Sequence, residues 1–477
     1  MSGRPDVNAT SKPDAAQPLA TAAEQLAAVA GGAVCVEQLA KQFLRQLELR
    51  RELRAFISVD ADALLRQARD HDAQSRGGHI PGPLSGLLLC VKDNIHVAGF
   101  TNTAGTPALN GYRPAADAEV VATLRAAGAL FVGKTNMHEL AFGITSVNAA
   151  YGAVANPHAL AKFAGGSSGG TAAAVAAGLV TAGLGTDTGG SARIPAALCG
   201  IVGFRPTSGR YSQLGTTPVS YTRDTIGPMA TTVSDVALLD AVITRQKPAS
   251  MPQPGSTIRL GMCSYFFELI DRDLRPVFDQ AVARLRAAGV DFVEVEMPSI
   301  GELVEQSAFP IAVFEVATEL SKYLEVYGTG VDLASVVRQV ASPDVKVLLD
   351  SAYPACSITA QGYQDALRAR AALADVYKRV FADHRLDAMV MPTTPLPARD
   401  ISGSGDTVEL NGLRVPTFPT YIRNTDPSTV AALPSLTIPA GFTSDHLPVG
   451  LMIDGASGED RRLLATGLSI ERVLGSA

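Results

Sequence analysis

The segment GLLLCV, residues 86–91, is a short run of apolar residues that ends in the polar triplet KDN. Such a run fits a strand that is buried on both faces, as in a largely parallel sheet. The segment DAEVVATLRAAG, residues 117–128, predicts a helix with Asp117 as its cap and Gly128 as its stop. The segment ALFVGKT, residues 129–135, predicts the next strand. The order strand, helix, strand favours a right-handed α/β crossover.

The same kinds of segment continue along the chain. Further strands are expected at residues 182–188, 258–262, 292–295, 388–391, 436–439 and 448–453, and further helices at 33–54, 171–180, 273–288 and 361–382. No internal repeat and no dividing linker is visible, and residues 245–257 are the expected surface crossover. We therefore expect one α/β domain over residues 25–477, with a mixed, largely parallel central sheet covered by helices on both faces. Residues 1–24 are expected to form a mobile tail.

Composition excludes several classes of partner. The chain has 477 residues, 47% of them apolar, and a formal net charge of −6 without a Lys/Arg-rich run, so no nucleic-acid partner is expected. There is neither a signal-peptide core nor a stretch of about 18 apolar residues, so neither secretion nor a membrane partner is expected. The five scattered cysteines form no CxxC pair, which favours a reducing compartment and a cytoplasmic location. A homodimer is left open.

Two short motifs match patterns whose physical requirements they do not meet. GALFVGKT, Gly128–Thr135, fits the phosphate-loop pattern GxxxxGK[ST], but its middle residues are typical of a strand and no helix start follows. The pattern match alone leaves open an alternative function, a nucleotide-binding ATPase module that uses Gly128–Thr135. GGSSG, residues 165–169, fits the nucleophile-elbow pattern, but no strand directly precedes it. The histidines are isolated, so no metal site is expected.

Two glycine-rich clusters and one lysine remain as candidate chemistry. The clusters are AGGSSGGTAAA, residues 164–174, and GTDTGGSARIPAALCG, residues 185–200. In the second, Ser191 follows two glycines, whose N–H groups could face an oxyanion. Lys92 ends a buried strand, where burial would lower its pKa and let it accept a proton. Asp93 follows it but need not pair with it, because successive strand side chains point to opposite faces. Flexible loops and a lysine that reaches towards solvent remain the alternative.

Five longer segments occur in a characteristic order and spacing. They are VKDNIHVAGFTNTAG, GKTNMHELAFG, AGGSSGGTAAAVAAG, GLGTDTGGSARIPAALCGIVGFRPTSGR and DTIGPMA. Together they resemble the amidase signature family. The resemblance is dense over residues 85–235 and weaker at DAMVMPTTPLPA and LPSLTIPAGFTSDHLPVGLMIDG.

This resemblance implies a role for each matching residue. Lys92 matches the general base, Ser167 the bridging serine that follows a cis peptide bond, and Ser191 the nucleophile. The remaining matches are an oxyanion hole from the N–H groups of Thr188, Gly189, Gly190 and Ser191, supporting residues Ser168, Asp187 and Arg193, and an acyl-pocket loop at Ala141, Phe142 and Gly143. The implied reaction is amide hydrolysis through an acyl-enzyme, with no metal and no cofactor.

Two further segments, SYTRDTIGP and LMIDGASGEDRRLL, resemble indoleacetamide and mandelamide hydrolases more than the glutaminase subunit of tRNA-dependent amidotransferases, which remains an alternative. The resemblance implies a small aryl- or alkyl-acetamide as substrate. Specificity is expected in the weakly matching residues 300–360 and 400–430. The candidate pocket aromatics there are Phe309, Phe314, Phe418 and Tyr421; for each one, packing in the core is the stronger alternative.

Overall fold

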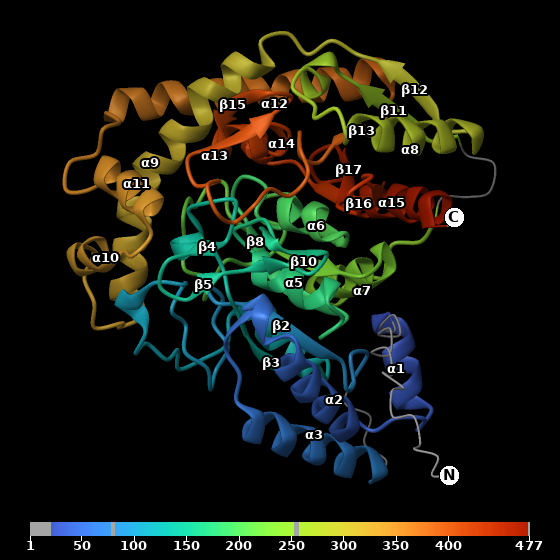
Figure 1. The fold of residues 1–477 in the computed structure, drawn as a ribbon, viewed down its shortest axis with the longest axis vertical. Coiled ribbons are helices and arrows are strands. Elements are labelled where there is room, and N and C mark those ends of the chain that lie inside the picture. Colours follow the sequence, from blue (N-terminus) through green and yellow to red (C-terminus); the bar gives the residue numbers. More distant parts are fainter. Residues whose placement is uncertain (1–20, 78–81, 252–256, 476–477) are drawn as a thin grey trace, which may run out of the picture.

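The computed structural model describes residues 21–77, 82–251 and 257–475. Residues 1–20 of the expected tail and residues 252–256 of the expected crossover lie outside the described residues. The described chain forms an α/β fold around a large twisted sheet, with helices on both sides of it (Figure 1). Helix α1, Ala22–Ala30, starts three residues before the expected domain boundary, and Ala22 is fully buried.

The main sheet has eleven strands within the described ranges. Their order across the sheet is β1 (Phe56–Ser58), β3 (Leu130–Thr135), β2 (Leu88–Lys92), β8 (Ala182–Asp187), β10 (Thr225–Ala230), β9 (Val202–Arg205), β16 (Ser435–Phe442), β17 (Pro448–Asp454), β13 (Ala388–Pro392), β11 (Arg259–Met262) and β12 (Asp291–Glu294). The expectation of a mixed sheet in a single α/β domain is confirmed.

Parallel pairing is found in two groups of strands. Strand β2 pairs in parallel with β3 and β8, and β11 pairs in parallel with β12 and β13. The other neighbours, from β8 across to β13 and at the β1 edge, pair antiparallel. The antiparallel share is larger than the sequence predicts. A strand buried on both faces has the same apolar pattern in either direction, so the sequence did not reveal that β10 inserts between β8 and β9.

Alternation along β2 divides the core between the two faces of the sheet. Leu87, Leu89 and Val91 join one apolar cluster, and Leu88 and Cys90 join the other. The first cluster packs against α4 (Glu119–Ala126), α7 (Val233–Thr244), α8 (Arg275–Ala287) and α15 (Asp460–Gly475), and the second against α2 (Val36–Leu49), α3 (Ala61–Arg76), α5 (Gly169–Ala176) and α6 (Arg193–Cys199).

The C-terminal half adds a layer of long helices. Helix α9 (Ile300–Val326) lies beside α12 (Ala360–His384) at one end of the molecule (Figure 1). The other elements are η1 (Arg51–Leu53), η2 (Pro107–Leu109), η3 (Glu139–Ala141), η4 (Ser264–Phe267), α10 (Leu333–Gln339), α11 (Pro343–Ala352), α13 (Thr417–Ile422), α14 (Asp426–Val430), and the strands β4 (Val147–Asn148), β5 (Gly152–Ala153), β6 (Ala155–Asn156), β7 (Ala159–Phe163), β14 (Thr407–Leu410) and β15 (Leu413–Pro416).

One expected helix cap is wrong. The residue before α4 is Ala118, and no side chain caps that helix. Asp117 instead accepts hydrogen bonds from the N–H of Ala98 and from the guanidinium of Arg125. Its carboxylate is thus taken by a loop amide and an ion pair. Among the helices of the described ranges, none combines the length and the apolar character that a membrane span requires.

Candidate active site

Lys92 is the last residue of β2 and is fully buried. Its Nζ donates hydrogen bonds to the hydroxyls of Ser167 and Thr186, each at 2.7 Å. Burial lowers the pKa of Lys92 to about 7, although the carboxylates of Asp187 and Asp224 act in the opposite direction. Near neutral pH the amine is therefore free of its extra proton in a large share of molecules and can accept one.

Ser167 belongs to the first glycine cluster and lies between Lys92 and the second cluster. The Gly166–Ser167 peptide bond is cis, as the resemblance implied. The carbonyl of Ser167 accepts a hydrogen bond from the N–H of His138 at 3.1 Å. The next residue, Ser168, donates its N–H to the carbonyl of Ser191 at 3.2 Å and its hydroxyl to the carbonyl of Thr186. Ser168 thus joins the two clusters through the backbone.

The second cluster is a tight turn between β8 and α6. The carboxylate of Asp187 accepts the N–H groups of Gly190 at 2.9 Å and Ala192 at 3.1 Å. Gly190 has a φ of +132°, and a Cβ there would lie 2.2 Å from Oγ1 of Thr425, so only glycine fits. Ser191 is 7% exposed, and within the described ranges its hydroxyl has no hydrogen-bond partner.

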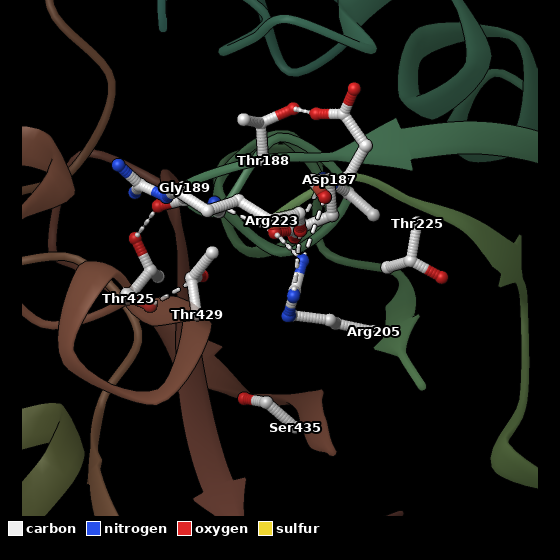
Figure 2. A network of polar contacts seen from close by, with 12 residues as sticks. Asp187, Thr188, Gly189, Arg205, Arg223, Thr225, Thr425, Thr429 and Ser435 are labelled. Carbon is white, nitrogen blue, oxygen red and sulfur yellow. Dashed lines mark hydrogen bonds and ion pairs between the residues drawn. The ribbon is translucent and has the colours of Figure 1, made fainter. Parts of the chain in front are cut away.

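Because the amide of Gly190 is taken within the turn, it is not available to an oxyanion. Of the four amides expected to form an oxyanion hole, those of Thr188, Gly189 and Ser191 remain candidate donors. The carbonyl of Gly189 is held by the hydroxyl of Thr425 at 2.6 Å, as Figure 2 shows. The turn is thus fixed from two sides, by its own aspartate and by the start of α14.

Two buried guanidinium groups surround Asp187. Arg193 contacts it through Nε at 3.0 Å and Nη2 at 3.1 Å. Arg205 contacts it through Nη1 at 3.2 Å (Figure 2). Burial alone would raise the pKa of Asp187, but Arg193 and Arg205 hold it well below its usual range. Arg193 also donates to the hydroxyls of Ser428, Thr429 and Ser435.

A family model described as Amidase matches residues 38–464 of the chain. The chain belongs to the amidase signature family. An indoleacetamide hydrolase of Agrobacterium vitis is 41% identical, over 92% of this chain and 94% of its own. A mandelamide hydrolase of Pseudomonas putida is also 41% identical, over 95% and 91%. The structure of a peptide amidase from Stenotrophomonas maltophilia matches with a TM-score of 0.83 at 31% identity and covers 97% of this chain and 98% of its own. This protein is therefore an amide-hydrolysing enzyme.

The phosphate-loop alternative is wrong for this amidase. Residues 130–135 form β3, and Lys134 is fully buried in it. Its Nζ lies 3.2 Å from Oδ1 of Asp93 and 3.0 Å from Oδ1 of Asn102. Asp93 therefore faces Lys134 and not Lys92, which confirms the expectation from strand alternation.

Asp224 is a charged residue of the site that sequence reasoning missed. Its Oδ1 accepts the hydroxyl of Thr188 at 2.5 Å, and its Oδ2 accepts the N–H groups of Val219 and Ser220. Burial raises the pKa of Asp224 to about 6, against the effect of these hydrogen bonds. Its place in the motif DTIGPMA was the available signal.

The expected acyl-pocket loop is buried beside Ser167. Ala141 and Phe142 are each 8% exposed and join an apolar cluster with α9, α10 and α11. A Cβ on Gly143 would lie within 2.5 Å of the His138 ring, so that ring packs on the glycine backbone. Since the N–H of His138 donates to the carbonyl of Ser167, a hydrogen bond connects this loop to Ser167.

The four aromatic pocket candidates have different environments. Tyr421 is fully buried and donates its hydroxyl to the carbonyl of Pro397, so it is a core residue. Phe314 stacks on Tyr363 with ring centroids 4.2 Å apart. Phe309 and Phe418 are 52% and 43% exposed. Among the described residues, no group of three or more potential metal ligands comes together.

Proposed function

We propose that this amidase hydrolyses small primary aryl- or alkyl-acetamides to a carboxylic acid and ammonia through an acyl-enzyme on Ser191. The observation that carries the proposal is the buried contact of 2.7 Å between Nζ of Lys92 and Oγ of Ser167. A lysine of lowered pKa in contact with a hydroxyl is a known way to activate a serine.

In the acylation step, Oγ of Ser191 forms a bond to the amide carbon. Its proton passes to Ser167, whose own proton passes to Nζ of Lys92. The negative charge that develops on the carbonyl oxygen is stabilised by the free amides of the turn held by Asp187. When the carbon–nitrogen bond breaks, the same relay returns a proton to the nitrogen, and ammonia leaves. Water then hydrolyses the ester by the reverse relay.

The substrate class rests on the relatives and on the exposed aromatics. The two relatives that are 41% identical are named as hydrolases of indoleacetamide and mandelamide, both arylacetic amides. Phe309 and Phe418 keep exposed rings in the segments where specificity is expected. This supports a hydrolase of small amides over a glutaminase subunit.

The test is ammonia release from a panel of primary amides that includes arylacetamides, alkylacetamides and glutamine. We expect the highest kcat/KM for an arylacetamide and none of this activity in Ser191→Ala. Preference for glutamine would contradict the proposed substrate class. A cytoplasmic location and the absence of a nucleic-acid or membrane partner remain part of the proposal. The net charge of −6 without a basic run supports the absence of a nucleic-acid partner, and the scattered cysteines support a reducing compartment.

A further inference from the structure

A small cavity lined mainly by residues with polar side chains lies beside the carboxyl end of β8. Its volume is about 10 Å³, and its wall includes Asn94, Thr186, Thr188, Thr216 and Asp224. A cavity of this size has room for about one water molecule, provided that polar groups surround it. Most of the residues around this cavity have polar side chains, unlike the apolar clusters that fill the core around it.

Two oxygen atoms of residues in the wall are without partners. Within the described ranges, Oδ1 of Asn94 and Oγ1 of Thr216 are buried and have no hydrogen bond. Asn94 as a whole is only 2% exposed. Buried polar groups in native proteins are nearly always paired with protein or with ordered water. Both oxygens belong to residues that line the same cavity, so one water could serve both.

The two sides of the cavity connect to different parts of the active site. On one side, the hydroxyl of Thr186 accepts hydrogen bonds from Lys92 at 2.7 Å and from Asn94 at 3.1 Å. On the other, Asp224 accepts the hydroxyl of Thr188, in the turn that carries the nucleophile. The cavity thus lies between two sets of hydrogen bonds at the carboxyl end of β8. One joins Thr186 to Lys92 and Asn94, and the other joins Thr188 to Asp224.

We propose that one water molecule occupies this cavity and that Asp224 is a positioning residue of the amidase. The water bonds Oδ1 of Asn94 and Oγ1 of Thr216 in a cavity that Asp224 also lines, and Asn94 in turn bonds Thr186, the hydroxyl partner of Lys92. The inference deepens the proposed function and rests on it, because it takes Lys92 as the general base.

Among the described residues, Asp224 is the carboxylate near Lys92 whose charge is not paired with an arginine. Burial lowers the pKa of Lys92, and the carboxylates of Asp187 and Asp224 raise it again. Asp187 is in direct contact with two arginines, whereas Asp224 bonds one hydroxyl and two backbone amides. The other ionisable groups near Asp224 are Arg205, which bonds the carbonyl of Arg223; Arg223 itself, whose guanidinium is paired with Asp426; and Glu315 on α9.

The experiment compares pH–rate profiles of kcat/KM for the wild type, Asp224→Asn and Glu315→Gln on one amide. Asparagine keeps the shape of the side chain and an acceptor for the amides of Val219 and Ser220, but it removes the charge. We expect the midpoint of the acid limb to move to lower pH by about half a unit or more in Asp224→Asn, because the ammonium form of Lys92 loses a stabilising charge.

Glu315→Gln is the matched control, because Glu315 is a buried carboxylate that binds Ser220 and Thr222 of the same loop. We expect its midpoint to equal that of the wild type. If Asp224→Asn lowers the rate but leaves the midpoint of the acid limb unchanged, Asp224 has only a structural role. That result would overturn this inference and leave the proposed function standing. The proposed function requires an acid limb in the wild-type profile and its loss in Lys92→Ala. If the wild type has no such limb, or if Lys92→Ala keeps it, both the proposed function and this inference are overturned.

A high-resolution crystal structure of the wild-type enzyme provides a second measurement that needs no variant. We expect density for a water within hydrogen-bond distance of Oδ1 of Asn94 and Oγ1 of Thr216. An empty cavity in well-ordered density would overturn the proposal whatever the variants do.

Discussion

Lys92 and Lys134 stand on neighbouring parallel strands, and both are fully buried, but their amines have different partners. Strand register places Lys134 opposite Val91, one residue from Lys92. The amine of Lys92 contacts the hydroxyls of Ser167 and Thr186. The amine of Lys134 contacts the carboxylate of Asp93 at 3.2 Å.

The difference shows that the partner, and not burial alone, decides what a buried lysine does. Burial lowers the pKa of both lysines. At Lys134 the adjacent carboxylate of Asp93 favours the ammonium form, so the pair is an internal ion pair. At Lys92 the hydrogen-bond partners of the amine among the described residues are two uncharged hydroxyls, which leave it able to give and take a proton. One lysine is suited to catalysis and the other to holding two strands together.

The largest effect should come from removing the hydroxyl of Ser191, the proposed nucleophile. Ser191→Ala deletes the reacting oxygen with little change in volume, so we expect a loss of amidase kcat of about 10⁴-fold or more with the fold intact. Ammonia release measures the loss, and circular dichroism checks the fold. Full labelling of the alanine variant by a serine-reactive fluorophosphonate would show that the nucleophile is another residue.

The next effect separates the two roles of a lysine, proton acceptor and positive charge. Lys92→Ala should lower amide turnover by about 10²–10⁴-fold, and less for esters of the same acid, because an amine leaving group needs the returned proton more. Lys92→Arg should not rescue the activity, since guanidinium stays charged. Matched amide and ester assays measure both variants. Near-normal amidase activity of the arginine variant would refute the proton relay.

Local sequence patterns predicted the two strands whose ends carry Lys92 and Lys134. The apolar run at 86–91 and the helix–strand segment after it placed β2 and β3 correctly, and strand alternation predicted that Asp93 turns away from Lys92. The family resemblance, and not composition or spacing, gave Ser167 its role and implied the cis peptide bond before it.

Contacts between distant segments were not predictable in this way. Arg205 reaches Asp187 from β9, and Asp224 reaches Thr188 from the position just before β10, the strand that inserts between β8 and β9. Helix α9 was also missed, because it packs against α12 on one side and α10 and α11 on another. Its buried residues therefore spread around the helix instead of forming one stripe.

A third prediction tests the structural lysine. Lys134→Met leaves the carboxylate of Asp93 buried without its partner, so the free energy of unfolding should fall by about 3–5 kcal/mol. Urea unfolding measures the change. The double variant Lys134→Met with Asp93→Asn should regain most of the stability, because the orphan charge is gone while Thr103 keeps an acceptor. A single variant as stable as the wild type would show that Asp93 and Lys134 are not an essential pair.

The smallest effect concerns how stability depends on pH. In the unfolded chain a lysine keeps its proton up to about pH 10.4, whereas burial lowers the pKa of Lys92 in the folded protein to about 7, with Asp187 and Asp224 partly opposing this. Between these values the unfolded state binds more protons than the folded state. Lys92 should therefore contribute a rise of stability with pH across this window, of about 1 kcal/mol per pH unit.

Lys92→Met removes that contribution, so its unfolding free energy should rise less steeply between about pH 7 and pH 10 than that of the wild type. Lys41→Met provides the control, because the side chain of Lys41 is 54% exposed and lies on the surface of α2. Urea unfolding at several pH values measures all three slopes. Equal slopes for the wild type and Lys92→Met would mean that Lys92 keeps its proton in the folded enzyme. In that event Lys92 would be a second charged lysine like Lys134, and the contrast between their hydroxyl and carboxylate partners would not explain which one acts as the base.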